Sequence, residues 1–239
     1  MNKPLRDYNN RRRYFEYRDK RLTQHEKMVE RELVKYLNEQ KERILERMPQ
    51  ELSKGLAEQV FNRDEERRLA KKALFPALRE VMGEEAAEVG GRFGVEIGVT
   101  AEMEAWLDNR ADVFSRQIND TTFEQLKTEI TEGRDAGESY DQIANRIDGK
   151  IDEISEGRAG VIARTETHSA QQKATIEGYK EAGVETKIWV AVMDNETRDT
   201  HAMVDGDEIP FDRHFDNGLK YPGDPAGGPE EIINCRCQI

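Results

Sequence analysis

The two cysteines of this chain, Cys235 and Cys237, both lie in its last five residues, with Arg236 between them. Two thiols this close could bind a metal ion, form a disulfide, supply a nucleophile or fill space in a core. A disulfide across one residue would close a strained ring. A catalytic thiol needs a neighbouring base, and no helix dipole is evident here to activate one. Residues two apart on a strand share a face, so we expect both thiols to be buried and Arg236 to point the other way.

A metal site would need further ligands. His201 together with the two cysteines offers three ligands of the type that zinc prefers, but a structural zinc site normally has four, and paired cysteines are usually spaced C-x-x-C. The sequence does not choose the fourth ligand among His168, Asp205 and His214. We therefore expect no cofactor, with zinc at His201, Cys235 and Cys237 as the alternative.

A carboxylate on a helix of small residues is the next group that could do chemistry. Glu166 follows the spacing of Ala159, Ala163, Ala170 and Ala174, and Arg164 lies on its flank. A carboxylate that faces a packed layer must find a partner or lose its charge. Arg198 and Arg236 are the expected partners. This pattern favours a structural ion pair over a general acid or base.

These polar residues together predict a network that braces the C-terminal region without performing a reaction. Its expected members are Arg164, Glu166, Asp194, Arg198, His201, Asp205 and Arg236. The alternative is a nuclease or transferase that uses Glu166, His201 and Asp205 as acid–base groups. Because no nucleophile has an evident base and no metal set is complete, we expect that the chain is not an enzyme.

The composition indicates which kind of secondary structure positions these polar residues. Charged residues make up 36% of the 239 residues, and the mean hydropathy is -0.88, which is typical of exposed helices. No apolar run is long enough to span a membrane, and the N-terminus lacks the apolar stretch of a secretion signal. We therefore expect a reducing compartment during synthesis and no membrane partner.

The charge is unevenly distributed. Residues 1–25 hold eight Lys or Arg and three acids, a net charge of +5, so the remainder carries -17 of the total of -12. An acidic body disfavours a protein that coats DNA broadly. The basic head could contact DNA, dock on an acidic protein, or simply pack locally. Its expected contact residues for DNA or a portal are Arg11, Arg12, Arg13, Arg18 and Arg21.

Helical periodicity dominates residues 26–154. The apolar spacing predicts a helix from Thr23 to Met48 that Pro49 stops, and a second helical stretch that is kinked or restarted near Pro76. A stripe of small residues, Ala86, Gly90, Gly94 and Gly98, would share one helix face and let another helix approach closely.

Three helix starts and one helix stop are predicted in the next stretch. Thr100 precedes an apolar run, while Thr121 and Ser139 stand three residues before Glu124 and Gln142 in the spacing of capping boxes. Gly133 is the expected stop between the second and third of these helices.

The pattern changes near residue 155. A helix is predicted from Ser155 to Glu181, followed by a strand in "TKIWVAV", a short helix, a stop at Gly206, a short strand, and a Pro/Gly-rich loop that leads into a terminal strand. The expected fold is therefore α+β: a basic aromatic arm (1–25), an elongated helical docking region (26–154) and a small α+β domain that ends in a strand (155–239).

The segments "IARTETHSA", "KIWVAVMDNETRDTHAMVDG" and "YPGDPAGGPEEIINCRC" occur in this order, and together they resemble the phage Mu protein F-like family of minor head, or head morphogenesis, proteins. The landmarks that carry the resemblance are Ala163–Glu166, Trp189, Asp194, Thr197, Arg198, His201, Asp205, Gly206 and Asn234–Cys237. The resemblance covers residues 155–239, and the helical region ahead of them is similar only in organisation.

The resemblance implies a virion protein of tailed phages that associates with the portal vertex inside the head and assists head assembly, DNA packaging or DNA ejection. The implied partners are the portal protein, the major capsid or scaffolding protein, and packaged DNA. The implied location is the head interior, and the host cytoplasm during assembly. Some members carry cysteine at the positions of Arg198 and His201 and a histidine near Ile232, which looks like a zinc ligand set. The resemblance thus implies that this chain replaces the metal with bonds centred on Arg198.

Overall fold

The computed structural model describes residues 8–49 and 55–239, so Lys3 and Arg6 of the basic head lie outside the described residues. The chain divides into two compact units. Unit 1 comprises Met1–Val29, Leu78–Ala105 and Val161–Ile239, and unit 2 comprises Glu30–Ala77 and Trp106–Gly160. Both units are discontinuous in sequence, whereas the expected parts, 1–25, 26–154 and 155–239, were consecutive. The difference arises because four long helices each contribute residues to both units.

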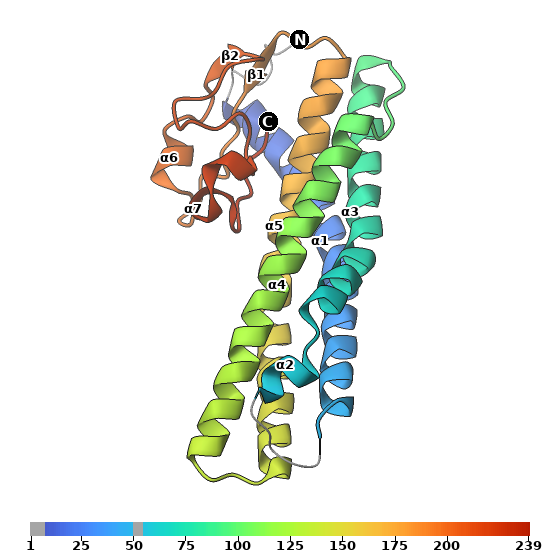
Figure 1. Cartoon of the computed structure of the whole chain (residues 1–239). Helices are drawn as coiled ribbons and strands as arrows, with labels where there is room; N and C mark the ends of the chain where they lie inside the picture. The colour runs from blue at the N-terminus through green and yellow to red at the C-terminus, as the bar shows by residue number, and fades with distance from the viewer. Residues whose placement is uncertain (1–7, 50–54) are drawn as a thin grey trace. The chain divides into compact units, whose positions relative to one another are not determined.

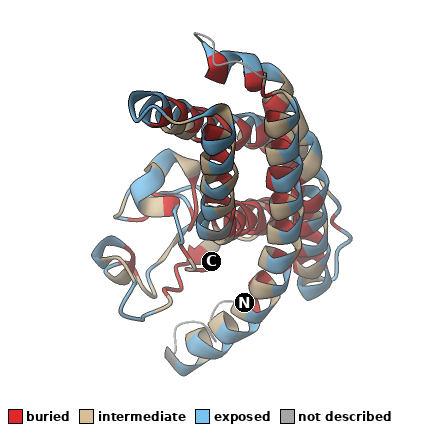
Figure 2. Cartoon of the chain, turned by 90° about the horizontal axis from the view of Figure 1, so that it is seen from below, coloured by how far each residue is buried: buried red, intermediate tan, exposed pale blue. Residues whose placement is uncertain are grey.

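Among the described residues, five helices precede the small sheet (Figure 1). They are α1 (Tyr8–Glu46), α2 (Leu56–Val60), α3 (Arg63–Phe93), α4 (Ala101–Asp135) and α5 (Tyr140–Glu181). Figure 2 shows the residues of the long helices graded from a buried side to an exposed side, as amphipathic helices require. The expected α+β class with a long helical N-terminal region is confirmed. Among the described residues, no helix is both long and apolar enough to span a bilayer.

Unit 2 combines an apolar cluster with a buried polar layer. The cluster includes Ile44, Phe61, Phe123, Ile143 and Ile147. In the polar layer, the Tyr36 hydroxyl and the Gln40 amide nitrogen each lie within hydrogen-bond distance of Asn119 Oδ1 and of the Glu66 carboxylate. Arg43 pairs with the same carboxylate at 2.7 Å. Buried polar groups that satisfy one another fix the register of α1 against α3 and α4.

The helix ends follow the local sequence at two of the three predicted starts. Thr100 Oγ1 accepts a hydrogen bond from the Met103 N–H, and Ser139 and Gln142 form the reciprocal bonds of a capping box. The start predicted at Thr121 is wrong, because α4 runs through it and its hydroxyl donates to the Gln117 carbonyl one turn earlier. A threonine inside a helix makes this bond as readily as it caps a helix.

A helix restart near Pro76 and a helix stop at Gly133 do not occur. Pro76 lies inside α3, at an exposed position where solvent can reach the carbonyl that lost its donor. Gly133 lies inside α4, which ends with Gly137 in the left-handed conformation at φ 71°. The Glu138 N–H bonds to the Gly133 carbonyl and closes this helix end.

The glycine stripe does not form one helix face. Gly94 has a φ of 69° and terminates α3, so Gly98 lies in the following loop. A Cβ at Gly90 would lie 2.4 Å from the Val95 carbonyl oxygen. The close approach therefore comes from the chain as it turns back on itself, and not from another helix.

α5 is longer than predicted, and one segment in its C-terminal half is buried on every side. It begins at Tyr140 rather than Ser155 and ends as expected before Gly183. Each residue from Thr165 to Gln172 is at most 5% exposed, although most of them are polar. Since a polar helix segment normally faces water, this burial indicates that other parts of unit 1 pack around it.

The remainder of unit 1 is a small α+β assembly. β1 (Thr186–Ile188) pairs antiparallel with β2 (Glu208–Pro210), and α6 (Asp199–Ala202) lies between them in sequence. A 3₁₀ turn, η2 (Pro225–Gly227), and α7 (Pro229–Ile232) follow. The expected terminal strand contributes one bridge, between Val190 and Gln238. Trp189 is fully buried in the core cluster beside Phe215 and both cysteines.

A buried lysine in β1 leads to a prediction on pH. Lys187 is 2% exposed and lies over the rings of Phe211 and Phe215. Burial, together with the nearby Lys220, lowers its pKa to about 8, against the opposing effect of Asp212 and Asp224. The charged form is thus disfavoured in the fold, and stability rises with pH between about 8 and the ordinary lysine value of about 10.4.

We expect Lys187→Met to raise the free energy of unfolding by about 2 kcal/mol at pH 7, with the gain shrinking as the pH rises through this window. Denaturant titrations at several pH values measure it. The exposed Lys20→Met variant is the control and should show little change. A gain at Lys187 that is independent of pH would contradict the expectation.

Candidate functional site

The two cysteines and His201 meet at one buried point of unit 1. Cys235 Sγ lies 3.7 Å and Cys237 Sγ 3.5 Å from His201 Nδ1. The three side chains are at most 2% exposed, and their ligand atoms all lie within 4.8 Å of one another. Both cysteines are free thiols in this structure. The prediction that the two thiols share one face and are buried is therefore confirmed.

His201 is positioned by its helix and by two neighbours. It belongs to α6, and its ring packs edge-on against Trp189 at 5.1 Å between centroids. Its Nε2 atom lies 2.8 Å from Glu231 Oε2. Contact with a carboxylate on one ring nitrogen orients the other, so Nδ1 is directed at the thiols. Glu231 was missed in the sequence, where no local signal distinguishes it from its neighbour Glu230.

The thiols have opposite electrostatic environments. The hydrogen bond from Cys235 lowers the pKa of Cys237 to about 5, helped by His201 and by the Val192 N–H and opposed by burial. The same bond and burial raise the pKa of Cys235 well above its ordinary value. The pair therefore favours one thiolate, which is the form that binds metals and attacks electrophiles.

α5 holds the segment that carries the cysteines. The Asn234 N–H donates to Thr165 Oγ1, and Arg164 donates to Asn234 Oδ1 at 3.2 Å. His168 Nε2 lies 2.7 Å from the Cys237 carbonyl oxygen. The ring of His168 is fully buried, and a Cβ at Gly223 would lie 2.8 Å from its Nδ1 atom. We call this set of bonds between 164–168 and 234–237 the C-terminal clamp.

Gln238 extends the clamp to the core. Its backbone exchanges two hydrogen bonds with Val190, at 2.9 and 2.8 Å. Its side-chain oxygen accepts bonds from Gln172 and Arg18. Arg236 points away from the thiols, as predicted, and binds Asp19 of α1 at 2.5 Å. The last residues are therefore bonded to α1, to α5 and to the segment after β1.

The other residues predicted for the polar network take separate positions. Arg198 donates to the carbonyls of Glu230 and Ile233 at the end of α7, and Glu166, for which it was an expected partner, is buried. Asp194 caps a turn through the Glu196 N–H and Thr197. Asp205 accepts bonds from the Ala191 N–H and from Arg11. Of the proposed acid–base set, His201 faces the thiols and Asp205 contacts Ala191 and Arg11, while Glu166 is buried on α5.

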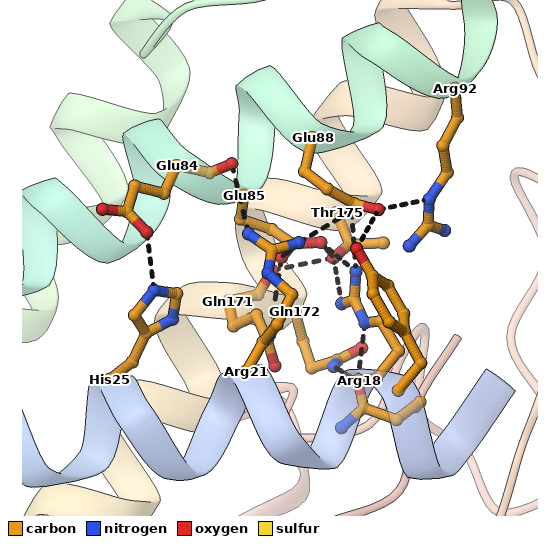
Figure 3. Close-up of polar contacts among 12 residues, drawn as sticks. Arg18, Arg21, His25, Glu84, Glu85, Glu88, Arg92, Gln171, Gln172 and Thr175 are labelled. Atoms are coloured by element: carbon orange, nitrogen blue, oxygen red, sulfur yellow. Dashed lines mark hydrogen bonds and ion pairs between the residues drawn. The ribbon is translucent and has the colours of Figure 1, made fainter. Parts of the chain in front are cut away.

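A buried ion pair connects α1 with α3 and α5 (Figure 3). Arg18 and Glu85 are both fully buried and directly paired, and Thr175 bonds to both. Glu88 and Arg21 lie at the edge of this cluster, 3.1 Å apart. Burial opposes the charge of Glu85, but Arg18 and Arg21 outweigh it and lower the pKa of its carboxyl. No local pattern predicts this pairing, since the partners are 67 residues apart.

This cluster corrects the expected role of the basic head. Arg18 is buried, so it is not at a surface where DNA or a portal could touch it. Arg21 and Arg11 are partly buried and bonded to Glu88 and Asp205. Arg12 and Arg13 are the exposed members of the predicted set. Arginines in a helix can contact a partner molecule or form ion pairs within the protein. Here Arg11, Arg18 and Arg21 form ion pairs within the protein, because acids from distant segments lie beside them.

Comparisons with known proteins agree with the landmarks. Residues 124–239 match the family model described as phage Mu protein F like protein. The minor head protein GP7 of Bacillus phage SPP1 is 32% identical over 116 residues, which are 46% of this chain and 37% of that protein. The NAD(+)–arginine ADP-ribosyltransferase EFV of Enterococcus faecalis is 36% identical over 131 residues, which are 51% of this chain and 26% of that protein. No solved structure matches the chain.

These matches correct one expectation. The second of these relatives is named for an enzymatic activity, which contradicts the expectation that the chain is not an enzyme. That expectation was based on the lack of an evident nucleophile with its base and on the incomplete set of metal ligands. Neither observation excludes an enzymatic activity. The chain spans between about a quarter and two fifths of the length of the curated relatives that it matches.

The landmarks have a common physical basis in the structure. Segment 163–166 supplies Arg164 and Thr165, which bond to Asn234. Segment 194–201 supplies the turn at Asp194 and the His201 ring, which contacts both cysteines of segment 234–237. Segments far apart in sequence thus converge on one corner of unit 1. Residues 124–239 therefore carry both the ordered landmarks and the match to the phage Mu protein F-like family model, and the minor head relative supports a phage head protein.

Proposed function

We propose that this chain is a minor head protein that associates with the portal vertex inside the phage head and assists head assembly, DNA packaging or DNA ejection. The observation that carries the proposal is the family match over residues 124–239, reinforced by the minor head relative. The portal protein is the proposed main partner, and the major capsid or scaffolding protein and packaged DNA are further ones. The proposed location is the virion, at the head interior.

The helical region 26–154 is the proposed docking surface. Its exposed side is rich in charge, and several ion pairs there are exposed, such as Lys71 with Asp108 and Arg63 with Glu124. Exposed pairs contribute little to stability, so their side chains are available to exchange partners. The exposed Arg12 and Arg13 are proposed to add a contact with portal protein or DNA.

Co-sedimentation with purified portal oligomers tests this function. We expect the full chain to sediment with the oligomers, and Arg12→Glu with Arg13→Glu to weaken binding several-fold without loss of fold. Arg213→Glu, at an exposed arginine outside the proposed docking surface, is the control. A chain that stays in the supernatant at micromolar concentrations of both proteins would contradict portal association.

The same variants separate a protein contact from a DNA contact. If Arg12 and Arg13 bind DNA phosphates, the affinity of the chain for DNA falls steeply with salt, and the double variant flattens that slope. An unchanged slope removes these arginines as DNA contacts and leaves portal binding to be judged by sedimentation alone.

A transferase is the second candidate function, because one relative is named as an NAD(+)–arginine ADP-ribosyltransferase. Incubation with labelled NAD+ and an arginine-containing acceptor tests it directly. Transfer of label by the purified chain would support this candidate, and its absence in the presence of an active transferase control would count against it.

A further inference from the structure

We propose that His201 Nδ1, Cys235 Sγ and Cys237 Sγ bind one Zn²⁺ ion, with the fourth coordination position open to a water molecule in the adjoining cavity. The proposal rests on the positions of these atoms and not on the assigned function. It differs from the sequence expectation, in which the C-x-C spacing and the missing fourth ligand argued against metal.

The distances between the ligand atoms match a tetrahedral zinc site. With Zn–S bonds of about 2.3 Å and a Zn–N bond of about 2.1 Å, a tetrahedron separates sulfur from nitrogen by about 3.6 Å. The two sulfur atoms lie 3.7 and 3.5 Å from His201 Nδ1. One ion placed among the three atoms would therefore reach all of them without rearrangement of the backbone.

The chemistry of the donors also selects zinc. Thiolate and imidazole are ligands that favour zinc over magnesium or calcium. The Glu231 carboxylate lies 2.8 Å from His201 Nε2, where a carboxylate commonly orients a metal-bound histidine by contacting its other ring nitrogen. The Val192 N–H supplies a hydrogen bond to Cys237, as is usual around metal thiolates.

The backbone conformation explains how two cysteines in a C-x-C spacing can bind the same zinc ion. Asn234 has a φ of 57°, a left-handed conformation that is unusual for a residue other than glycine, and it turns the chain just before Cys235. The C-terminal clamp then fixes both sides of the cysteine pair, through Thr165 at Asn234 and His168 at Cys237. Strain held at one point by surrounding bonds is typical of functional sites.

None of the residues considered as the fourth ligand takes that place. His168 is bonded to the Cys237 carbonyl, Asp205 to Ala191 and Arg11, and His214 is exposed. Instead, a cavity of about 40 Å³ adjoins the three ligands. It is lined by polar residues that include Asp194, Thr197 and Arg198. A polar space of this size holds one water molecule.

Metal analysis of the full-length protein tests the proposal. After saturation with zinc and extensive dialysis, we expect about one zinc per chain, and none in Cys235→Ser with Cys237→Ser. His214→Ala is the matched control and should retain the full content. Glu231→Gln should keep the stoichiometry but weaken zinc affinity by roughly 10- to 100-fold, because the carboxylate that orients the His201 ring is lost.

Two further measurements keep the test independent of whether the serine variant folds. Cobalt added to the metal-free wild type should give the absorption of a four-coordinate thiolate complex, and zinc should raise the melting temperature in a concentration-dependent way. A folded wild type that retains no zinc, shows no cobalt–thiolate absorption and melts at the same temperature with and without zinc would overturn the proposal. Failure of portal binding would leave it unaffected.

Discussion

Replacing Glu85 with glutamine is expected to lower the free energy of unfolding by about 3–5 kcal/mol. The change removes the carboxylate that pairs directly with the fully buried Arg18 guanidinium. Glu88, 3.5 Å away and 17% exposed, compensates the charge less well, and breaking a buried pair by removing one partner costs that much. Thr175 and Gln238 also bond to Arg18, but neither neutralises it. Chemical denaturation followed by circular dichroism measures the effect.

Two variants sharpen this result. Arg18→Met combined with Glu85→Leu should recover most of the lost stability, since it removes both charges together. Arg12→Met breaks a pair with Glu16 in which both side chains are more than 60% exposed, and should cost less than about 1 kcal/mol. Equal effects of Glu85→Gln and Arg12→Met would show that the buried cluster does not form.

The pH dependence has a definite sign. Because the pKa of Glu85 is lowered in the fold, its contribution is present above the ordinary carboxyl value of about 4.3 and is lost as the pH falls below it. Part of the acid sensitivity of the wild type should therefore be missing in Glu85→Gln.

Replacing His168 with alanine is expected to cost about 3 kcal/mol of unfolding free energy. The substitution empties the space that the ring fills against Gly223 and leaves the Cys237 carbonyl without its partner. His214→Ala changes an exposed histidine and should stay within about 0.5 kcal/mol. A loss below about 1 kcal/mol at His168 would show that this bond does not hold the segment.

Local patterns in the sequence predicted the features that depend on neighbouring residues. Helical spacing, the cap at Thr100, the capping box at Ser139 and the stop at Gly183 follow from contacts within a turn or two, so they could be found without a structure. The shared face of Cys235 and Cys237 followed from strand alternation in the same way.

Features that depend on distant residues could not be found in this way. Arg18 looked like part of a basic surface, and only the return of α3 brings Glu85 to it. Thr121 carries the same pattern as a cap, and the surrounding helix decides which bond it makes. The α5 segment from Thr165 to Gln172 is buried although most of its residues are polar. Hydropathy alone would place this segment at the surface, because the residues that bond to it, such as Gln238, lie at the end of the chain.

Amide hydrogen exchange tests most directly whether the family landmarks form one interlocked structural unit. The amides of Val190 and Gln238 bond to each other's carbonyls, and the Asn234 amide bonds to Thr165. We predict that these three amides exchange about as slowly as those of α5 between 165 and 175, since local opening would break the whole clamp. Exchange of these amides at the rate of an unstructured peptide, while α5 stays protected, would contradict the account.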